Sequence, residues 1–248
     1  MKEQTQFPAE EVTLPSKGLL YPEDSPLRKG VIEMKYMTAK EEDILTNQNL
    51  IENGTVIDKL LKSLIVTPCD YNELLTGDKN AILIAARVLG YGADYSFDYN
   101  GETISFDLTT IKDKELDESL ITEGKNEFKF DLPISKTLIT FKFLTHGDEV
   151  TIDNELKGLK KFDKNSSNEL TTRMKYIITS INGDYEGKTI RNFVDNNFLA
   201  RDARELRKYI GKIQPSVDLS YDYEDQRGNI KTIDIPVGIN FFWPDATI

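Results

Sequence analysis

The sequence predicts an α+β fold with a mainly helical body, an inserted small antiparallel β subdomain, a C-terminal β-hairpin and an extended N-terminal arm. Three observations predict it. Prolines and glycines interrupt the first 30 residues, apolar residues then recur at helical spacing, and their period changes to two at Tyr95 and back after Gly147. These changes divide the chain into the arm (1–30), a helical N-terminal part of the body (31–93), the β subdomain (94–146) and a helical C-terminal part with a closing hairpin and an aromatic tail (147–248).

The arm, residues 1–30, contains four prolines, two glycines and only short apolar groups, so no periodic element is expected there. An arm of this kind either packs on its own domain or lies against a partner protein. The prolines reduce the entropy that is lost when a partner orders the arm, which favours partner binding with little contribution to the fold. Its candidate partner-binding residues are Phe7, Val12, Leu14, Leu19, Leu20 and Tyr21.

Two capping boxes predict helix starts in the first part of the body. Thr38 is followed three residues later by Glu41, and Thr55 is followed in the same way by Asp58. The second of these helices carries apolar residues at helical spacing and is expected to end before Pro68.

Residues 80–92 are the expected centre of the N-terminal core. Their sequence, NAILIAARVLGYG, leaves no polar face, which is typical of a buried helix, and Gly90 is its predicted C-terminal cap. The small residues Ala85 and Ala86 allow neighbouring elements to approach closely. A larger side chain at Ala85 is therefore expected to overpack the core.

Alternating apolar residues predict strands in the β subdomain. Residues 95–108 alternate on both sides of Asn100 and Gly101, a pair that favours a tight hairpin turn. Residues 127–132 and 138–144 alternate in the same way. Together these strands are expected to form one small antiparallel sheet.

Helical spacing returns in residues 171–181 and 199–212, and a second hairpin is predicted around Gly228. An aromatic tail follows. Large rings left in water would promote association, so the tail is buried either in this chain's own core, the interpretation we favour, or against a partner. These further candidate partner-binding residues are Phe241, Phe242 and Trp243.

The composition argues against several classes of function. With 31 basic and 42 acidic residues the formal net charge is −11, which repels phosphate, so no nucleic-acid partner is expected. No window approaches the roughly 20 apolar residues of a membrane-spanning helix, so no membrane insertion is expected. The N-terminal residues lack the apolar region of a secretory signal, which predicts that the chain stays in the cytoplasm in which it is made.

The sequence offers few groups for catalysis. One cysteine, Cys69, and one histidine, His146, do not suffice for a closed metal site, so no metal and no cofactor is expected. His146 precedes an acidic helix start, where a polar turn contact is a simpler interpretation than a general base. The acidic residues leave a carboxylate-based glycan hydrolase as a remote alternative, although no pair stands out. No catalytic residue is predicted, and the chain is expected not to be an enzyme.

Five segments carry a resemblance to a known family. They are LPSKGLLYP (14–22), EMKYMTAKEEDILTN (33–47), LIENGTVIDKLLKSLI (50–65), GDKNAILIAARVLGYG (77–92) and GINFFWPD (238–245). These segments resemble the T4-type bacteriophage baseplate hub family. Many members of that family place paired cysteines in the hairpin region, in a pattern like that of a zinc knuckle. This chain has the aromatic hairpin of residues 95–108 there, so the resemblance implies apolar packing in place of zinc.

The resemblance implies a structural component of a contractile phage tail baseplate, near the hub and central spike. Such a component acts through contacts with other baseplate and tail proteins in a hetero-oligomeric assembly. Its expected location is the virion, after assembly in the cytoplasm of the bacterial host. The resemblance also implies an alternative, a hub assembly chaperone that is absent from the mature virion. The proline-rich arm and the aromatic tail favour permanent contacts, and hence the virion component.

Overall fold

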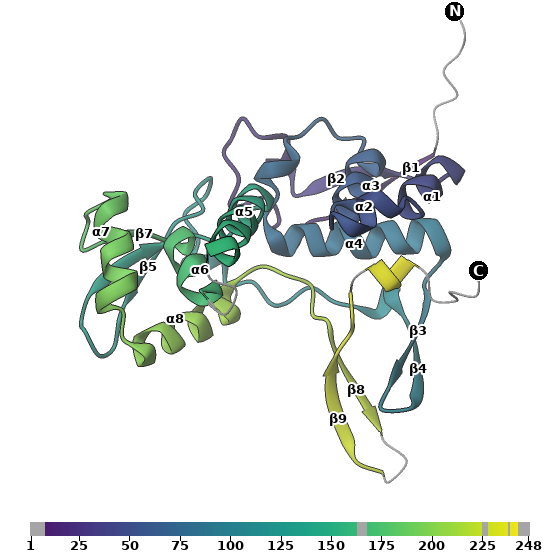
Figure 1. Cartoon of the computed structure of the whole chain (residues 1–248). Helices are drawn as coiled ribbons and strands as arrows, with labels where there is room; N and C mark the ends of the chain where they lie inside the picture. Colours follow the sequence, from purple (N-terminus) through teal and green to yellow (C-terminus); the bar gives the residue numbers. More distant parts are fainter. Residues whose placement is uncertain (1–7, 163–167, 225–227, 238, 243–248) are drawn as a thin grey trace, which may run out of the picture.

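The computed structural model describes residues 8–162, 168–224, 228–237 and 239–242. It confirms the α+β class, with helices and several small antiparallel sheets. The described helices gather in two lobes, an N-terminal lobe (residues 8–91) and a C-terminal lobe (residues 128–213) (Figure 1). Hairpins project below the N-terminal lobe in the same view.

The N-terminal lobe packs helices beside a small sheet. Strand β1 (Ala9–Thr13) pairs antiparallel with β2 (Val31–Lys35). The helices are α1 (Ala39–Leu45), α2 (Gln48–Glu52), α3 (Val56–Leu64) and α4 (Thr76–Tyr91). The core between them includes Leu27, Ile32, Met34, Leu45, Leu60, Leu61 and Ile82, all fully buried. Burial of this apolar surface is the main stabilising term of the lobe.

The predicted capping box at the start of α1 is confirmed. The Thr38 backbone N–H donates to Glu41 Oε2 (3.0 Å), and the Thr38 hydroxyl donates to the same oxygen (2.5 Å). Glu41 is fully buried and also accepts from Lys35 Nζ (2.9 Å) and Ser63 Oγ (2.7 Å). Burial opposes ionisation, but the hydrogen bonds from Thr38, Ser63 and Lys35 outweigh it and lower the pKa of Glu41 to about 2. This carboxylate therefore joins β2, α1 and α3.

The second predicted capping box is wrong. Helix α3 begins where expected, but the Thr55 side chain makes no capping hydrogen bond. Asp58 instead turns away from the helix start and accepts from Tyr71 Oη (3.0 Å) and Lys79 Nζ (2.5 Å). A charged partner on a neighbouring helix has replaced the local backbone contact.

Helix α4 runs through the centre of the lobe, as predicted, but its ends and faces differ in detail. It continues to Tyr91 and is ended by Gly92, whose φ of 85° is accessible to glycine at little cost. Gly90, the predicted cap, lies inside the helix, where a Cβ would meet the Met37 side chain. Ala86 is fully buried, whereas Ala85 is half-buried and faces a groove. Overpacking is therefore expected at Ala86, whereas a larger side chain at Ala85 has the groove to enter, and the stability cost predicted for Ala85 stays a prediction.

The predicted hairpins are confirmed. Strands β3 (Asp94–Tyr99) and β4 (Glu102–Asp107) pair with each other, and so do β8 (Ser220–Glu224) and β9 (Ile230–Asp234). The turn of the first uses positive φ at both Asn100 and Gly101, as a type I′ turn requires. The hairpins pack together through aromatic pairs, Phe106 with Tyr221 (5.4 Å between ring centroids) and Tyr99 with Tyr223 (5.7 Å).

The single sheet expected within residues 94–146 is wrong. Strands β5 (Phe128–Asp131) and β6 (Leu138–Phe141) form, but their sheet is completed by β7 (Ile178–Ile181). Within the described ranges β3 and β4 pair only with each other. Residues 178–181 were expected to continue a helix. They are the segment ITSI, in which three of four residues are β-branched, and its pairing with β6, for example Ile139 opposite Ile181, overrides the helical spacing.

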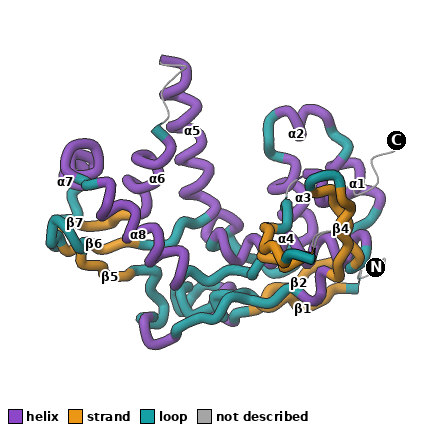
Figure 2. The backbone as a smooth tube through the Cα atoms, turned by 90° about the horizontal axis from the view of Figure 1, so that it is seen from below, coloured by secondary structure: helices purple, strands orange, loops and turns teal. Residues whose placement is uncertain are grey.

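The C-terminal lobe places helices around this sheet. They are α5 (His146–Phe162), α6 (Glu169–Ile177), α7 (Gly187–Asn192) and α8 (Ala200–Ile213). Helix α8 buries Leu206 and Ile210 on the predicted stripe. Its buried Asp202 accepts from the backbone N–H groups of Ile134 (2.8 Å) and Ser135 (3.0 Å) and so holds the turn between β5 and β6. Figure 2 shows the two lobes side by side, with α5 rising between them.

The prediction that the arm contributes little to the fold is wrong. Leu14, Leu20 and Tyr21 are almost completely buried, at 1%, 3% and 3% exposure, in the core of the N-terminal lobe. Val12 and Leu19 are half-buried, and Phe7 lies outside the described residues. Leu14, Leu20 and Tyr21 are thus core residues and offer no free surface to a partner.

A buried carboxylate fixes the arm to α4. Asp78 Oδ1 accepts from the Ser16 backbone N–H (2.9 Å), and Oδ2 accepts from Ser16 Oγ (2.7 Å) and Tyr21 Oη (2.6 Å). Tyr21 Oη in turn accepts the Leu75 backbone N–H (3.0 Å). These hydrogen bonds hold the arm against this chain's own helix.

The interpretation that the aromatic tail lies in the chain's own core is confirmed for Phe241 and Phe242, which are fully buried. The Phe241 ring meets the Tyr95 ring edge-on, with 4.8 Å between ring centroids. Arg87 Nε donates to the backbone oxygen of Phe241 (3.0 Å). Phe241 and Phe242 therefore do not form a partner-binding surface. Trp243 lies outside the described residues.

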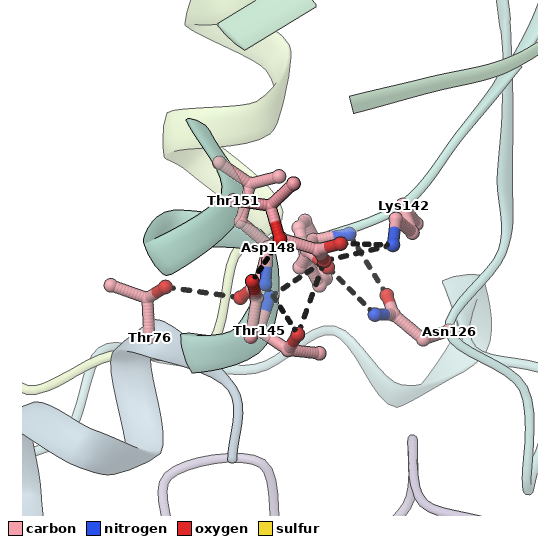
Figure 3. A network of polar contacts seen from close by, with 9 residues as sticks. Thr76, Asn126, Lys142, Thr145, Asp148 and Thr151 are labelled. Carbon is pink, nitrogen blue, oxygen red and sulfur yellow. Dashed lines mark hydrogen bonds and ion pairs between the residues drawn. The ribbon is translucent and has the colours of Figure 1, made fainter. Parts of the chain in front are cut away.

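Polar contacts join the two lobes at the start of α5 (Figure 3). Thr145 and Asp148 cap the helix reciprocally, with Thr145 N donating to Asp148 Oδ2 (3.0 Å) and Asp148 N donating to Thr145 Oγ1 (3.3 Å). Lys142 Nζ lies 2.8 Å from both carboxylate oxygens. Thr76, at the start of α4, donates from both its N–H (3.1 Å) and its hydroxyl (3.0 Å) to the Leu144 oxygen. The starts of α4 and α5 are thereby held together.

Candidate interaction surface

The histidine singled out in the sequence belongs to a cluster of ionisable groups between α3, α4 and α5. Lys79 Nζ lies 2.5 Å from Asp58 Oδ1 and 3.2 Å from His146 Nδ1. Tyr71 donates to the same aspartate and meets the His146 ring edge-on, with 4.6 Å between ring centroids. We call these four residues the Asp58 cluster.

The charges of the Asp58 cluster stabilise one another. Burial lowers the pKa of His146, and the neighbouring Lys79 lowers it further, so the imidazole is neutral near pH 7. Burial acts against ionised Asp58, but the hydrogen bond and charge of Lys79 outweigh it and lower the pKa of that carboxyl. Burial and the charge of Asp58 raise the pKa of Tyr71. Within the described part of the chain no hydroxyl or thiol nucleophile bonds to His146, and the arrangement is that of a link between helices.

A groove along α4 offers a different kind of surface. It has a volume of about 610 Å³ and runs between β1 and the chain at residues 108–113, with α4 as its floor. We call it the α4 groove. Its apolar lining consists of Val12, Ala81, Ile84, Ala85, Val88, Leu89, Leu108, Ile111 and Val217. A concave apolar surface of this size is in the range of binding sites in proteins.

The floor of the α4 groove is partly open to solvent. Ala85, Val88 and Leu89 are half-buried, in contrast to Ile82 and Ala86 on the opposite, core-facing side of the helix. The small Ala85 side chain leaves the backbone of α4 approachable. An apolar side chain from another molecule would therefore remove further apolar area from water here.

The rim of the α4 groove is acidic. Glu10 and Glu11 on β1 and Asp113 on the opposite wall are exposed, and no basic side chain occurs among the described lining residues. Desolvation by neighbouring protein atoms raises the pKa of the Asp113 carboxyl even though the residue is exposed, and the charge of Lys17 acts in the opposite direction. The surface thus combines an apolar floor with a negative rim.

One wall of the groove is the edge of a strand. Four successive residues of β1, from Glu10 to Thr13, line it, and successive strand residues point to opposite faces of a sheet, so the groove follows the strand's edge and not one face. In the described part of the chain β1 pairs only with β2. No described residue therefore pairs with this edge.

Of the predicted partner-binding residues that the structure describes, only Val12 lies in the α4 groove. Sequence reasoning missed the others, because a helix that is apolar nearly all round does not reveal which of its faces a neighbour leaves uncovered. The small residue Ala85, interpreted as a close-packing position, was the available signal. The small side chain of Ala85 does leave space beside α4, but that space belongs to the α4 groove and is not filled by a neighbouring core element.

Comparisons with protein-family models, with curated proteins and with solved structures find no match for this chain. In the described ranges no helix has the length and apolar character that a membrane crossing requires. The same residues contain no group of three or more histidine, cysteine, aspartate or glutamate side chains placed to hold a metal ion.

Proposed function

We propose that this chain is a non-enzymatic structural component of a contractile phage tail baseplate, near the hub and central spike, and that it acts through contacts with other tail proteins. The observation that carries the proposal is the α4 groove, a partly uncovered apolar surface with an acidic rim and an open strand edge. Surfaces that combine an apolar centre with a polar rim are typical of protein–protein contacts.

The arrangement of the resembling segments supports the same proposal. Residues 14–22 are fixed to α4 by Asp78, residues 33–47 form β2 and α1, and residues 77–92 are α4 itself. The described part of residues 238–245 packs against α4 through Arg87. The segments that resemble the baseplate hub family therefore build one unit, and the α4 groove lies on that unit.

Quantitative mass spectrometry of purified mature virions tests the proposal. A virion component is expected at a fixed ratio to the other baseplate proteins. Presence in assembly intermediates and absence from mature virions would assign the alternative role, a hub assembly chaperone. Absence from both would overturn the proposal. Particles lacking an essential baseplate protein provide the control, because a chain that is merely co-purified would be found with them at an unchanged ratio.

A further inference from the structure

The hydrogen-bonding pattern of β1 shows which of its backbone groups face β2 and which face the open edge. The Leu14 N–H donates to Gly30 O (2.8 Å), and the Tyr36 N–H donates to Pro8 O (3.4 Å). These bonds lie at the two ends of the antiparallel register in which Glu10 is opposite Met34 and Val12 is opposite Ile32.

Alternate residues of a strand direct their backbone groups to opposite sides. Pro8, Glu10, Val12 and Leu14 therefore direct theirs towards β2. The N–H and C=O groups of Ala9, Glu11 and Thr13 point to the open side, where the α4 groove lies. Figure 2 shows β1 at the margin of the N-terminal lobe. An uncovered strand edge of this kind is a template for pairing with another chain.

We propose that an extended segment of a partner protein, with apolar and basic residues in alternation, adds to β1 as a further strand and fills the α4 groove. The proposal rests on the proposed function and names the partner chemistry for the same surface. Main-chain pairing with Ala9, Glu11 and Thr13 supplies affinity, and the groove supplies specificity through alternate side chains.

Charge and shape define the partner segment. Its apolar side chains face Ala85 and Val88 on the floor of the groove, and the intervening side chains lie on the face of the sheet that carries Glu11. Glu10 and Asp113 add further negative charge at the rim. The rim carries no basic group among the described lining residues, and the chain has a net charge of −11, so lysine or arginine is favoured at these positions. A second copy of this chain is less suited, because its own acidic surface would be repelled.

The test uses the full-length protein and a synthetic probe, a fluorescein-labelled eight-residue peptide in which valine alternates with lysine. Binding is measured by fluorescence anisotropy at low and at physiological salt. Two control peptides separate the contribution of charge from that of main-chain pairing. One has glutamate in place of lysine, and the other has proline in place of two valines. We expect both controls to bind roughly tenfold more weakly, the first through charge repulsion and the second through lost pairing.

Variants of the protein test the pairing itself. Glu11→Pro removes an outward-facing N–H without touching the bonds to β2, because proline is tolerated where the N–H of an edge strand faces outwards. Glu11→Ala is its matched control, since it removes the same carboxylate and keeps the N–H. Ala85→Lys blocks the floor of the groove, and Leu170→Lys places the same charge on an exposed site of α6. We expect Ala85→Lys to weaken binding by about tenfold and Leu170→Lys to change it by about twofold or less. Glu11→Ala measures the loss of the rim carboxylate alone, and we expect Glu11→Pro to bind about tenfold more weakly than Glu11→Ala.

Hydrogen exchange provides an internal control that does not depend on variants. The peptide is expected to slow exchange at the Glu11 and Thr13 amides, while those of Glu10 and Val12, already bonded to β2, change little. Equal binding by the proline-interrupted peptide, or unchanged binding by Glu11→Pro, would overturn the proposal. Self-association that Glu11→Pro abolishes would also overturn it, by assigning a second copy to the groove. If the peptide does not bind but mass spectrometry finds the chain in virions, strand addition to β1 is rejected. The proposed function is not affected by that result.

Discussion

Deletion of residues 1–22 is predicted to unfold the N-terminal lobe. Leu14, Leu20 and Tyr21 are exposed by only 1%, 3% and 3%, and each buried apolar side chain contributes about 1.5–3 kcal/mol, so their loss costs roughly 5–9 kcal/mol. The deletion also removes Ser16, leaving the buried carboxylate of Asp78 without its donors, which costs about another 3–5 kcal/mol. The sum is comparable with the whole stability of a domain, about 5–15 kcal/mol.

Urea unfolding followed by circular dichroism measures this loss, and a point variant keeps the test quantitative if the truncated chain does not fold. Tyr21→Phe retains the ring but removes the hydroxyl that donates to Asp78 and accepts from Leu75, at an expected cost of about 1.5–3 kcal/mol. Tyr185→Phe, at a side chain that is 61% exposed, is the matched control and should change stability by about 0.5 kcal/mol or less. A truncated chain with an unchanged unfolding midpoint, or a Tyr21→Phe variant as stable as Tyr185→Phe, would refute the structural role of the arm.

Further predictions concern the core and its charges. Ala86→Leu should overpack a fully buried position and cost about 1–3 kcal/mol, whereas Ala85→Leu points into the groove and should lower the melting temperature less; the opposite order would be inconsistent with the faces assigned to α4. The pKa of Glu41, about 2, lies below its ordinary value of 4.5, so its contribution of roughly 3 kcal/mol is present above pH 4.5 and is lost as the pH falls towards 2. Unfolding curves of wild type and Glu41→Gln should therefore differ at pH 7 and converge near pH 2, and a constant difference would count against the assigned hydrogen bonds. Elemental analysis of dialysed protein should find no stoichiometric metal, and stoichiometric zinc would contradict that expectation.

Local signals in the sequence predicted the elements that local chemistry determines. The Thr38 and Glu41 capping box needs only residues three positions apart, and the turn at Asn100 and Gly101 needs only residues that accept positive φ. Both hairpins and the central helix were predicted for the same reason. The α+β class followed from the order of these periods.

Contacts between distant parts of the chain could not be predicted. Residues 178–181 have apolar side chains at helical spacing, and only their pairing with β6 makes them a strand. The arm carries no periodicity of its own, and the partner that fixes Ser16 is Asp78, 62 residues away. Such overrides of local preference depend on the assembled structure.

The candidate site shows the same limit. A helix that is apolar nearly all round predicted burial of α4 correctly, but not that Ala85 and Val88 would be left facing a groove. Among the described strands β1 pairs with β2 alone, so its open edge is a property of the sheet and not of residues 9–13. The acidic rim depends on the fold that brings Asp113 to the same groove as Glu10, more than 100 residues away in the sequence.

Site-specific photo-crosslinking in assembled particles tests the interaction surface most directly. A benzophenone amino acid in place of Val88, on the floor of the α4 groove, is compared with the same group in place of Leu170, which is exposed on α6. We predict that the group at position 88 crosslinks the chain to another protein of the tail baseplate, and that the group at position 170 does not give this product. Equal crosslinking from both positions, or no crosslink to any tail protein from position 88 in particles that contain the chain, would contradict the role assigned to the groove.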